Sequence, residues 1–170
     1  MEGKMRVLLV LLLSCGLVDS QPVNKCHLQE LMIQATKGKS NGLSDRTFMA
    51  KITCAVETVT RFNTSAVNQM THTGNRVWKF YGIFQLTNGL TCSDDTAQLP
   101  NICGANCTDF LDDNINDDLQ CLLKSFTSLI KGGFSGENFE DIRTMIMFFL
   151  PGHCKNQNGT EYFADCNKVT

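Results

Sequence analysis

Apolar residues recur every three or four positions in two segments near the start of the chain, which is the spacing of one buried helix face. They are Leu28, Leu31, Met32 and Ala35 within residues 24–35, and Phe48, Ile52, Ala55, Val56 and Val59 within residues 44–60. Asn24 is a candidate N-cap for the first segment. The pattern predicts two amphipathic helices joined by a loop at residues 38–42.

The helical period disappears over residues 64–86. Residues 67–71 and 77–81 flank the turn signal Thr73-Gly74-Asn75, which predicts a small antiparallel sheet. Helical spacing returns in residues 117–130 and 139–149, with a glycine-rich loop between them and Pro151 after the second. Helices, a sheet and then helices again predict an α+β domain.

The first twenty residues have the composition of a secretory signal peptide. Lys4 and Arg6 precede an unbroken apolar run at residues 7–13, and small residues precede a cleavage point near Gln21. The apolar run is too short to span a membrane, and no later stretch is long enough either. We therefore predict a secreted protein in which residues 1–20 are removed and residues 21–170 form one domain.

Eight of the nine cysteines follow this leader: Cys26, Cys54, Cys92, Cys103, Cys107, Cys121, Cys154 and Cys166. An even number in a secreted chain predicts four disulfides, for which the sequence alone permits 105 pairings. The short spacing from Cys103 to Cys107 would also suit a metal, although the secretory context favours disulfides over zinc.

The formal net charge of −2 argues against a nucleic-acid-binding face and against a strongly cationic binder of bacterial walls. Three sequons, at Asn63, Asn106 and Asn158, predict N-glycosylation in a eukaryotic secretory pathway. The alternative is that some stay unmodified, above all Asn106, because the next residue is a cysteine expected to be bridged.

Two local motifs add to the cysteine frame. Cys54-Ala55 runs on to Phe62-Asn63-Thr64, and residues 81–85 read Tyr-Gly-Ile-Phe-Gln. With the cysteine order, these motifs resemble the C-type lysozyme and α-lactalbumin family (glycoside hydrolase family 22) over roughly residues 25–166. The resemblance implies a lysozyme-like fold, with a helical subdomain and a small antiparallel β subdomain. It also implies four disulfides: Cys26–Cys166, Cys54–Cys154, Cys92–Cys107 and Cys103–Cys121.

Hydrolases of this family use two carboxylates, a Glu at the end of the second helix as general acid and an Asp in the sheet. By the resemblance, those positions hold Val59 and Phe80 here. Glu57 stands two residues before Val59, about 200° away around the helix, so we interpret it as a solvated residue. A general acid alone is worth roughly 10²–10⁴ in rate, and the loss of both carboxylates predicts negligible hydrolysis.

The substrate cleft implied by the resemblance is altered too. Leu90-Thr91 replaces a pair of aromatics, Met147 stands beside the acid's position, and Gln85 is retained. Trp78 could replace the lost sugar platform, but core or hairpin packing is the favoured interpretation. Extra residues between Cys121 and Cys154, placed at 131–138, border the cleft and could cover it.

An acidic loop precedes the third predicted helix, with five Asp between positions 109 and 118. Calcium takes six to eight oxygen ligands, several of them carboxylates. The loop resembles the family's calcium elbow, which implies carboxylate ligands from Asp112, Asp117 and Asp118 and carbonyl ligands from Asp109 and Asn114. The alternative is a solvated acidic helix start, since Asp is favoured at helix N-termini.

Two classes of function follow. We expect a secreted, monomeric, calcium-binding protein that has lost the catalytic carboxylates and binds a glycan or a protein partner. The alternative is a divergent lysozyme that still hydrolyses a peptidoglycan-type polysaccharide, which only the fold favours. No nucleic-acid partner is expected.

Overall fold

The computed structural model describes residues 22–39, 42–72, 75–95, 100–136 and 138–166, so the predicted signal peptide and the Thr73-Gly74 turn lie outside the described residues. Helix α1 (Lys25–Thr36) begins where predicted, because the Asn24 side chain accepts hydrogen bonds from the N–H groups of Cys26 and His27. Asp45 caps helix α2 (Arg46–Val59) in the same way.

Strands β1 (Val67–His72) and β2 (Arg76–Tyr81) form the predicted antiparallel hairpin, with Val67 opposite Tyr81. The short strand β3 (Leu86–Thr87) extends this sheet, and β4 (Cys92–Ser93) pairs in parallel with β5 (Ala105–Asn106). Neither short pairing was predicted. Alternation along β2 points Trp78 and Phe80 inward, while Val77 is half exposed.

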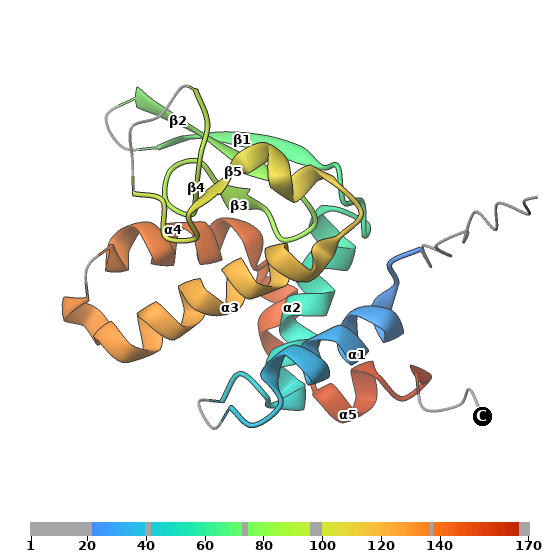
Figure 1. Ribbon diagram of the computed structural model, residues 1–170. Helices are drawn as coiled ribbons and strands as arrows, with labels where there is room; N and C mark the ends of the chain where they lie inside the picture. Colours follow the sequence, from blue (N-terminus) through green and yellow to red (C-terminus); the bar gives the residue numbers. More distant parts are fainter. Residues whose placement is uncertain (1–21, 40–41, 73–74, 96–99, 137, 167–170) are drawn as a thin grey trace, which may run out of the picture.

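Helix α3 (Ile115–Gly132) begins two residues earlier than the sequence indicated, and α4 (Phe139–Phe149) has the predicted bounds. The two helices lie side by side beneath the β subdomain (Figure 1). The segment between them was predicted to be a glycine-rich loop, and this prediction is corrected because the segment contains a 3-10 turn, η3 (Gly133–Ser135). The other short helical turns are η2 (Cys107–Leu111), η4 (Gly152–Asn156) and α5 (Gly159–Tyr162).

Two apolar clusters hold these elements together. The larger one joins the buried faces of α1, α2 and α3 to the loop after β2. The smaller one joins the inner face of the sheet to α4 and contains Trp78, Phe80, Leu90, Ile142 and Met145. The sheet is therefore packed on one helix that belongs to the C-terminal part of the chain.

The four disulfides have the pairing that the family resemblance implies. They join Cys26 to Cys166, Cys54 to Cys154, Cys92 to Cys107 and Cys103 to Cys121. The first two close the longest loops and restrict the unfolded chain most in the entropic model, by roughly 4–5 kcal/mol each. All eight cysteines of the described residues are thus in disulfides, which rules out the zinc alternative at Cys103 and Cys107.

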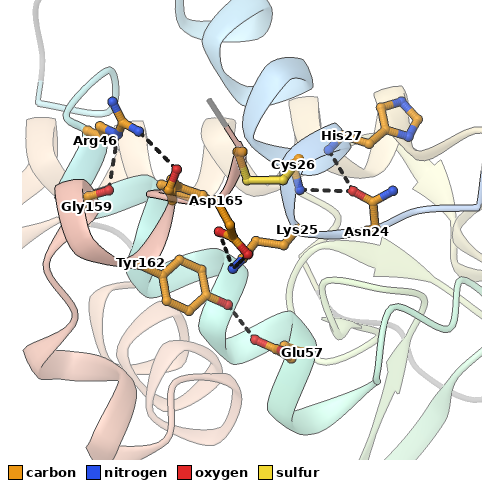
Figure 2. A network of polar contacts seen from close by, with 11 residues as sticks. Asn24, Lys25, Cys26, His27, Arg46, Glu57, Gly159, Tyr162 and Asp165 are labelled. Carbon is orange, nitrogen blue, oxygen red and sulfur yellow. Dashed lines mark hydrogen bonds and ion pairs between the residues drawn. A yellow bond between two sulfur atoms is a disulfide. The ribbon is translucent and has the colours of Figure 1, made fainter. Parts of the chain in front are cut away.

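A network of polar contacts fixes the C-terminal segment to α1 and α2 (Figure 2). Lys25 pairs with Asp165 at 2.8 Å, beside the Cys26–Cys166 disulfide. The Arg46 guanidinium donates to the backbone oxygen of Gly159 at 3.1 Å. The short helix α5 is held through these long-range contacts.

Candidate functional site

The position that the resemblance gives to the general acid is occupied by Val59, the last residue of α2. Its isopropyl group is partly buried and has no proton to donate. Thr60, which follows, turns inward and donates from its hydroxyl to the carbonyls of Val56 and Ile83. The end of α2 therefore offers packing and a local hydrogen bond but no acid.

The position that the resemblance gives to the sheet carboxylate holds Phe80, which is fully buried. Its ring stacks on the ring of Phe148 from α4, with centroids 3.9 Å apart and planes 20° from parallel. Trp78 lies beside it, with ring centroids 6.4 Å apart. An aromatic stack between the sheet and α4 thus occupies the place where a lysozyme-type enzyme needs an ionised carboxylate next to its substrate.

The residues around this stack are inaccessible as well. Leu90 and Thr91, at the positions of the family's paired aromatics, have no exposed surface, and Trp78 is also completely buried. Trp78 packs so closely that a Cβ at Gly89 would collide with its indole. The structure agrees with the favoured interpretation that Trp78 is a core residue. No sugar can stack on Trp78 in this conformation.

Gln85, which the resemblance identifies as a retained cleft residue, is held inside the protein by hydrogen bonds. It is fully buried, its amide nitrogen donates to the Gly82 carbonyl at 2.9 Å, and its amide oxygen accepts from Asn68 at 2.7 Å. Met147, expected beside the acid, is instead half exposed. Gln85 is therefore buried and Met147 faces solvent, so these two residues do not form a substrate-binding surface together.

Glu57 does not take over the role of the acid. It is exposed on the side of α2 that faces α5, where its carboxylate accepts a 2.6 Å hydrogen bond from the Tyr162 hydroxyl (Figure 2). Burial, and then this hydrogen bond and the charge of Glu57, raise the pKa of Tyr162 above its ordinary value. Glu57 therefore helps to hold α5 in place.

Asp94 lies close to the sheet, but on the side opposite to Phe80. Its carboxylate accepts from the Tyr81 hydroxyl at 2.8 Å and from the Asn88 amide at 3.0 Å. Tyr81 and Phe80 are neighbours on β2, so their side chains point to opposite faces of the sheet. Asp94 cannot replace a carboxylate at Phe80.

The acidic loop runs from η2 into the first turn of α3. Within it, Asp118 is almost completely buried, and its Oδ2 atom has no hydrogen-bond partner. Burial, and then the charges of Asp117 and Asp112, raise the pKa of Asp118 from 3.8 to about 8. A buried carboxylate with a free oxygen close to two other acidic groups fits a hard divalent cation, which would compensate both the burial and the repulsion.

The other members of the predicted calcium set lie at the surface. Asp112 and Asp117 are exposed, and Asp112 accepts a 2.8 Å hydrogen bond from the Asn114 N–H. The Asp109 side chain accepts a 2.9 Å hydrogen bond from the N–H of Asn106, and the resemblance assigns only the backbone carbonyl of Asp109 to the ion. Among the described residues, the carboxylates of Asp112, Asp117 and Asp118 do not all come within 4.8 Å of one another.

Neighbouring segments support the acidic loop. Asp113 accepts from the Thr64 hydroxyl at 2.9 Å, and the Ser65 hydroxyl donates to the Leu111 carbonyl. Gly82 passes so close that a Cβ there would collide with the Phe110 carbonyl and come within 2.8 Å of Asp118. Sequence reasoning missed these supports, although the glycine of the Tyr-Gly-Ile motif was a signal that the backbone needs space there.

One other group could hold a metal in principle. Within the described part of the chain, the ligand atoms of Cys54, His153 and Cys154 lie within 4.8 Å of one another. The two sulfurs form a disulfide and are not thiolates, so they are poor metal ligands. Asn63, Asn106 and Asn158 are all exposed, and their glycosylation stays a prediction.

A model described as the C-type lysozyme/alpha-lactalbumin family matches residues 21–132 of this chain. Helix α4, which packs on Phe80, follows the matched segment. Lysozyme C, milk isozyme, of Equus caballus is 32% identical over 144 residues, which cover 85% of this chain and 97% of that protein. Alpha-lactalbumin of Notamacropus eugenii is 30% identical over 123 residues, or 71% and 80% of the two chains.

Solved structures agree with these sequence relatives. A calcium-binding lysozyme from equine milk has a TM-score of 0.59 and 29% identity, covering 85% of this chain and 97% of that one. The holo form of canine milk lysozyme has a TM-score of 0.58 and 28% identity over the same shares. Among the described residues, no helix has both the length and the apolar character to cross a membrane.

Proposed function

The chain belongs to the C-type lysozyme/alpha-lactalbumin family, and we propose that it is a secreted, non-hydrolytic member whose fold is stabilised by calcium. The observation that carries the proposal is the buried stack of Phe80 on Phe148. It removes the sheet carboxylate and fills the adjoining space with apolar side chains. We therefore propose that the protein binds a glycan or a protein partner and does not cleave a glycan.

Loss of both carboxylates removes the two groups on which the family's chemistry depends. Without an acid the leaving oxygen is not protonated, and without a nearby carboxylate the developing positive charge is not stabilised. Within α2 and β2 the nearest acidic side chain is Glu57, which is engaged with Tyr162. The enclosed surface around Trp78 also leaves no exposed aromatic face for the sugar.

Calcium binding is the second part of the proposal. Carboxylate oxygens of Asp112, Asp117 and Asp118, with the carbonyls of Asp109 and Asn114, would hold the ion by moving the exposed groups toward the buried one. The free Oδ2 of Asp118 supports this arrangement. A calcium-binding lysozyme from equine milk shares the fold, which also supports the proposal. When bound, the ion supplies charge compensation at the start of α3, not a catalytic step.

The test is hydrolysis of bacterial cell walls and of a chitin oligosaccharide by the purified protein, with a milk lysozyme as positive control. We expect no turnover, with or without calcium. Clear turnover that survives purification would overturn the proposal in favour of a divergent lysozyme. Turnover abolished by Glu57→Gln would in addition identify Glu57 as the acid.

A further inference from the structure

Three lysines surround a surface pocket of about 630 Å³ that is separate from the aromatic stack and from the acidic loop. Its lining residues are Lys39, Gln120, Leu123, Lys124, Thr127, Ser128 and Lys131. Every charged group among them is positive, in a chain with a net charge of −2. The pocket is therefore positively charged, whereas the whole chain carries a net negative charge.

The pocket is built from two segments that are far apart in sequence. Gln120, Lys124, Thr127 and Lys131 follow one another on α3 at intervals of four, three and four, so they share one face of the helix. The two lysines of this row are separated by about 10 Å along the helix axis, at 1.5 Å per residue. The third lysine comes from the segment after α1.

The position of Lys39 is fixed by its backbone. Its N–H donates to the Thr36 carbonyl at 2.9 Å, and its own carbonyl accepts from the Ser44 hydroxyl at 3.1 Å. Its side chain is exposed, as are those of Lys124 and Lys131. None of the three ammonium groups is paired with a carboxylate of the described residues.

Ordinary surface chemistry explains only part of this arrangement. Lys131 lies in the last turn of α3, where a cation is favourable for the helix dipole. That argument does not apply to Lys124 in the middle of the helix or to Lys39 in another segment. Three like charges around one hollow repel one another, and an anion in the hollow would relieve this repulsion.

We propose that this pocket, the lysine pocket, binds a glycan that carries sulfate esters. Lysine ammonium groups hold tetrahedral oxyanions as point charges, and two lysines spaced along a helix suit successive charges on an extended chain. Gln120 and Ser128 are exposed beside them and can hydrogen-bond sugar hydroxyls. The only apolar lining side chain, Leu123, is buried, which favours a hydrophilic sugar over a lipid surface.

The lysine pocket is independent of calcium and of the closed cleft, so its test does not depend on the proposed function. Binding of a heparin-derived hexasaccharide is measured by titration calorimetry, with the desulfated hexasaccharide and inorganic sulfate as comparison ligands. The variant Lys124→Gln/Lys131→Gln removes two charges of the pocket. Lys51→Gln/Lys155→Gln removes two lysines that do not line it and serves as the charge-matched control.

We expect the sulfated hexasaccharide to bind, and the pocket variant to bind it about tenfold more weakly, the combined effect of two exposed charge pairs. The control variant should bind the hexasaccharide like the original protein. Lys39→Gln, which removes the pocket lysine in the segment after α1, should also weaken binding. Equal weakening in the control variant, equal binding of the desulfated sugar, or binding of inorganic sulfate alone would overturn the proposal. Preferential binding to anionic vesicles through the same lysines would replace the glycan by a membrane. Circular dichroism verifies that each variant is folded.

Discussion

Phe80 has two effects at the same position. It removes a carboxylate, and its ring stacks on Phe148 so that α4 covers the inner face of the sheet. Val59, which the resemblance places at the acid's position, is only partly buried at the end of α2. The two substitutions therefore differ in reversibility, since a carboxylate at position 59 would be partly exposed, whereas one at position 80 would be buried among aromatic rings.

Restoring both carboxylates, by Val59→Glu with Phe80→Asp, should not restore hydrolysis. Removing a buried Phe costs about 3–5 kcal/mol, and an unpaired buried carboxylate adds to that cost. We expect a lower denaturant midpoint and no clearing of bacterial walls. Val59→Glu alone is the matched control and should stay close to the original stability. Wall hydrolysis by the double variant would show that the cleft opens and would contradict the closed arrangement.

Gly82 connects the sheet to the acidic loop. Its φ of +71° disfavours side chains, and a Cβ would press on the Phe110 carbonyl and on Asp118. Gly82→Ala should therefore lower the free energy of unfolding and weaken any response to calcium. Gly38→Ala is the control, because Gly38 has a similar φ of +77° but open space around it. Equal thermal shifts of the two variants would show that only backbone strain matters.

At the scale of elements, the caps were the most predictable features. Asn24 marked the start of α1, because capping depends on neighbouring residues only, and the predicted segment 44–60 contains the whole of α2. Strands β3, β4 and β5 are only two residues long, which is too short for an alternating pattern to reveal them. The pairing of β4 with β5 also lies next to the Cys92–Cys107 disulfide. The start of α3 at Ile115 rather than 117 reflects burial of an apolar residue ahead of the acidic turn.

The candidate site is a sequence prediction whose environment only the structure describes. The family motifs lead to the acidic loop, Val59 and Phe80, and the roles of these residues stay predictions. The sequence could not show that Asp118 alone among the loop carboxylates is buried with a free oxygen, or that Phe148 is the partner of Phe80. Both depend on how segments far apart in sequence pack together.

Helix α5 is held to α2 through Tyr162, and this contact can be followed by titration. The chain has two tyrosines, and both have raised pKa values, Tyr81 to about 12 through burial and Asp94. Phenolate absorbance should therefore rise at a higher pH in the folded protein than in the unfolded chain, in which the tyrosine pKa is 10.0. The stability that the two native phenols contribute is present below pH 10 and is lost as the pH rises through their native pKa values.

Each tyrosine can be assigned by removing its partner. Glu57→Gln should lower the pKa of Tyr162 and leave Tyr81 unchanged, and Asp94→Asn should do the reverse. The measurement is an ultraviolet titration of each variant under native conditions. If both variants give the original curve, burial alone sets these pKa values, and the contact between Tyr162 and Glu57 does not hold α5.

For the whole molecule, charge is separated along α3. Its first turn carries Asp117 and Asp118 next to the proposed ion, and its later turns carry the lysines of the lysine pocket. Two disulfides tie the C-terminal segment to α1 and α2, and α4 closes the inner face of the sheet. We therefore propose that the fold combines an ion site at the start of α3 with a cationic surface farther along the same helix, away from the closed cleft.

Calcium and pH should act on stability through the same carboxylate. The native pKa of Asp118 is raised to about 8, so between about pH 4 and 8 the folded state without calcium binds more protons than the unfolded state. In excess chelator, stability should therefore fall as the pH rises through this range. Calcium requires the ionised carboxylate, so with calcium the melting temperature should instead hold or rise toward neutral pH. At 100 times the dissociation constant the ion would add roughly 2.7 kcal/mol.

Asp118→Asn is the matched variant for this experiment, because it keeps the shape of the side chain but neither titrates nor offers a charged ligand. Its melting temperature should be nearly independent of pH between 5 and 8 and should not respond to calcium. Thermal melts of both proteins, with calcium or chelator at fixed ionic strength, decide the matter. Identical curves for the original protein in calcium and in chelator would mean that the acidic loop is a solvated helix start, since a bound ion must stabilise the state that binds it.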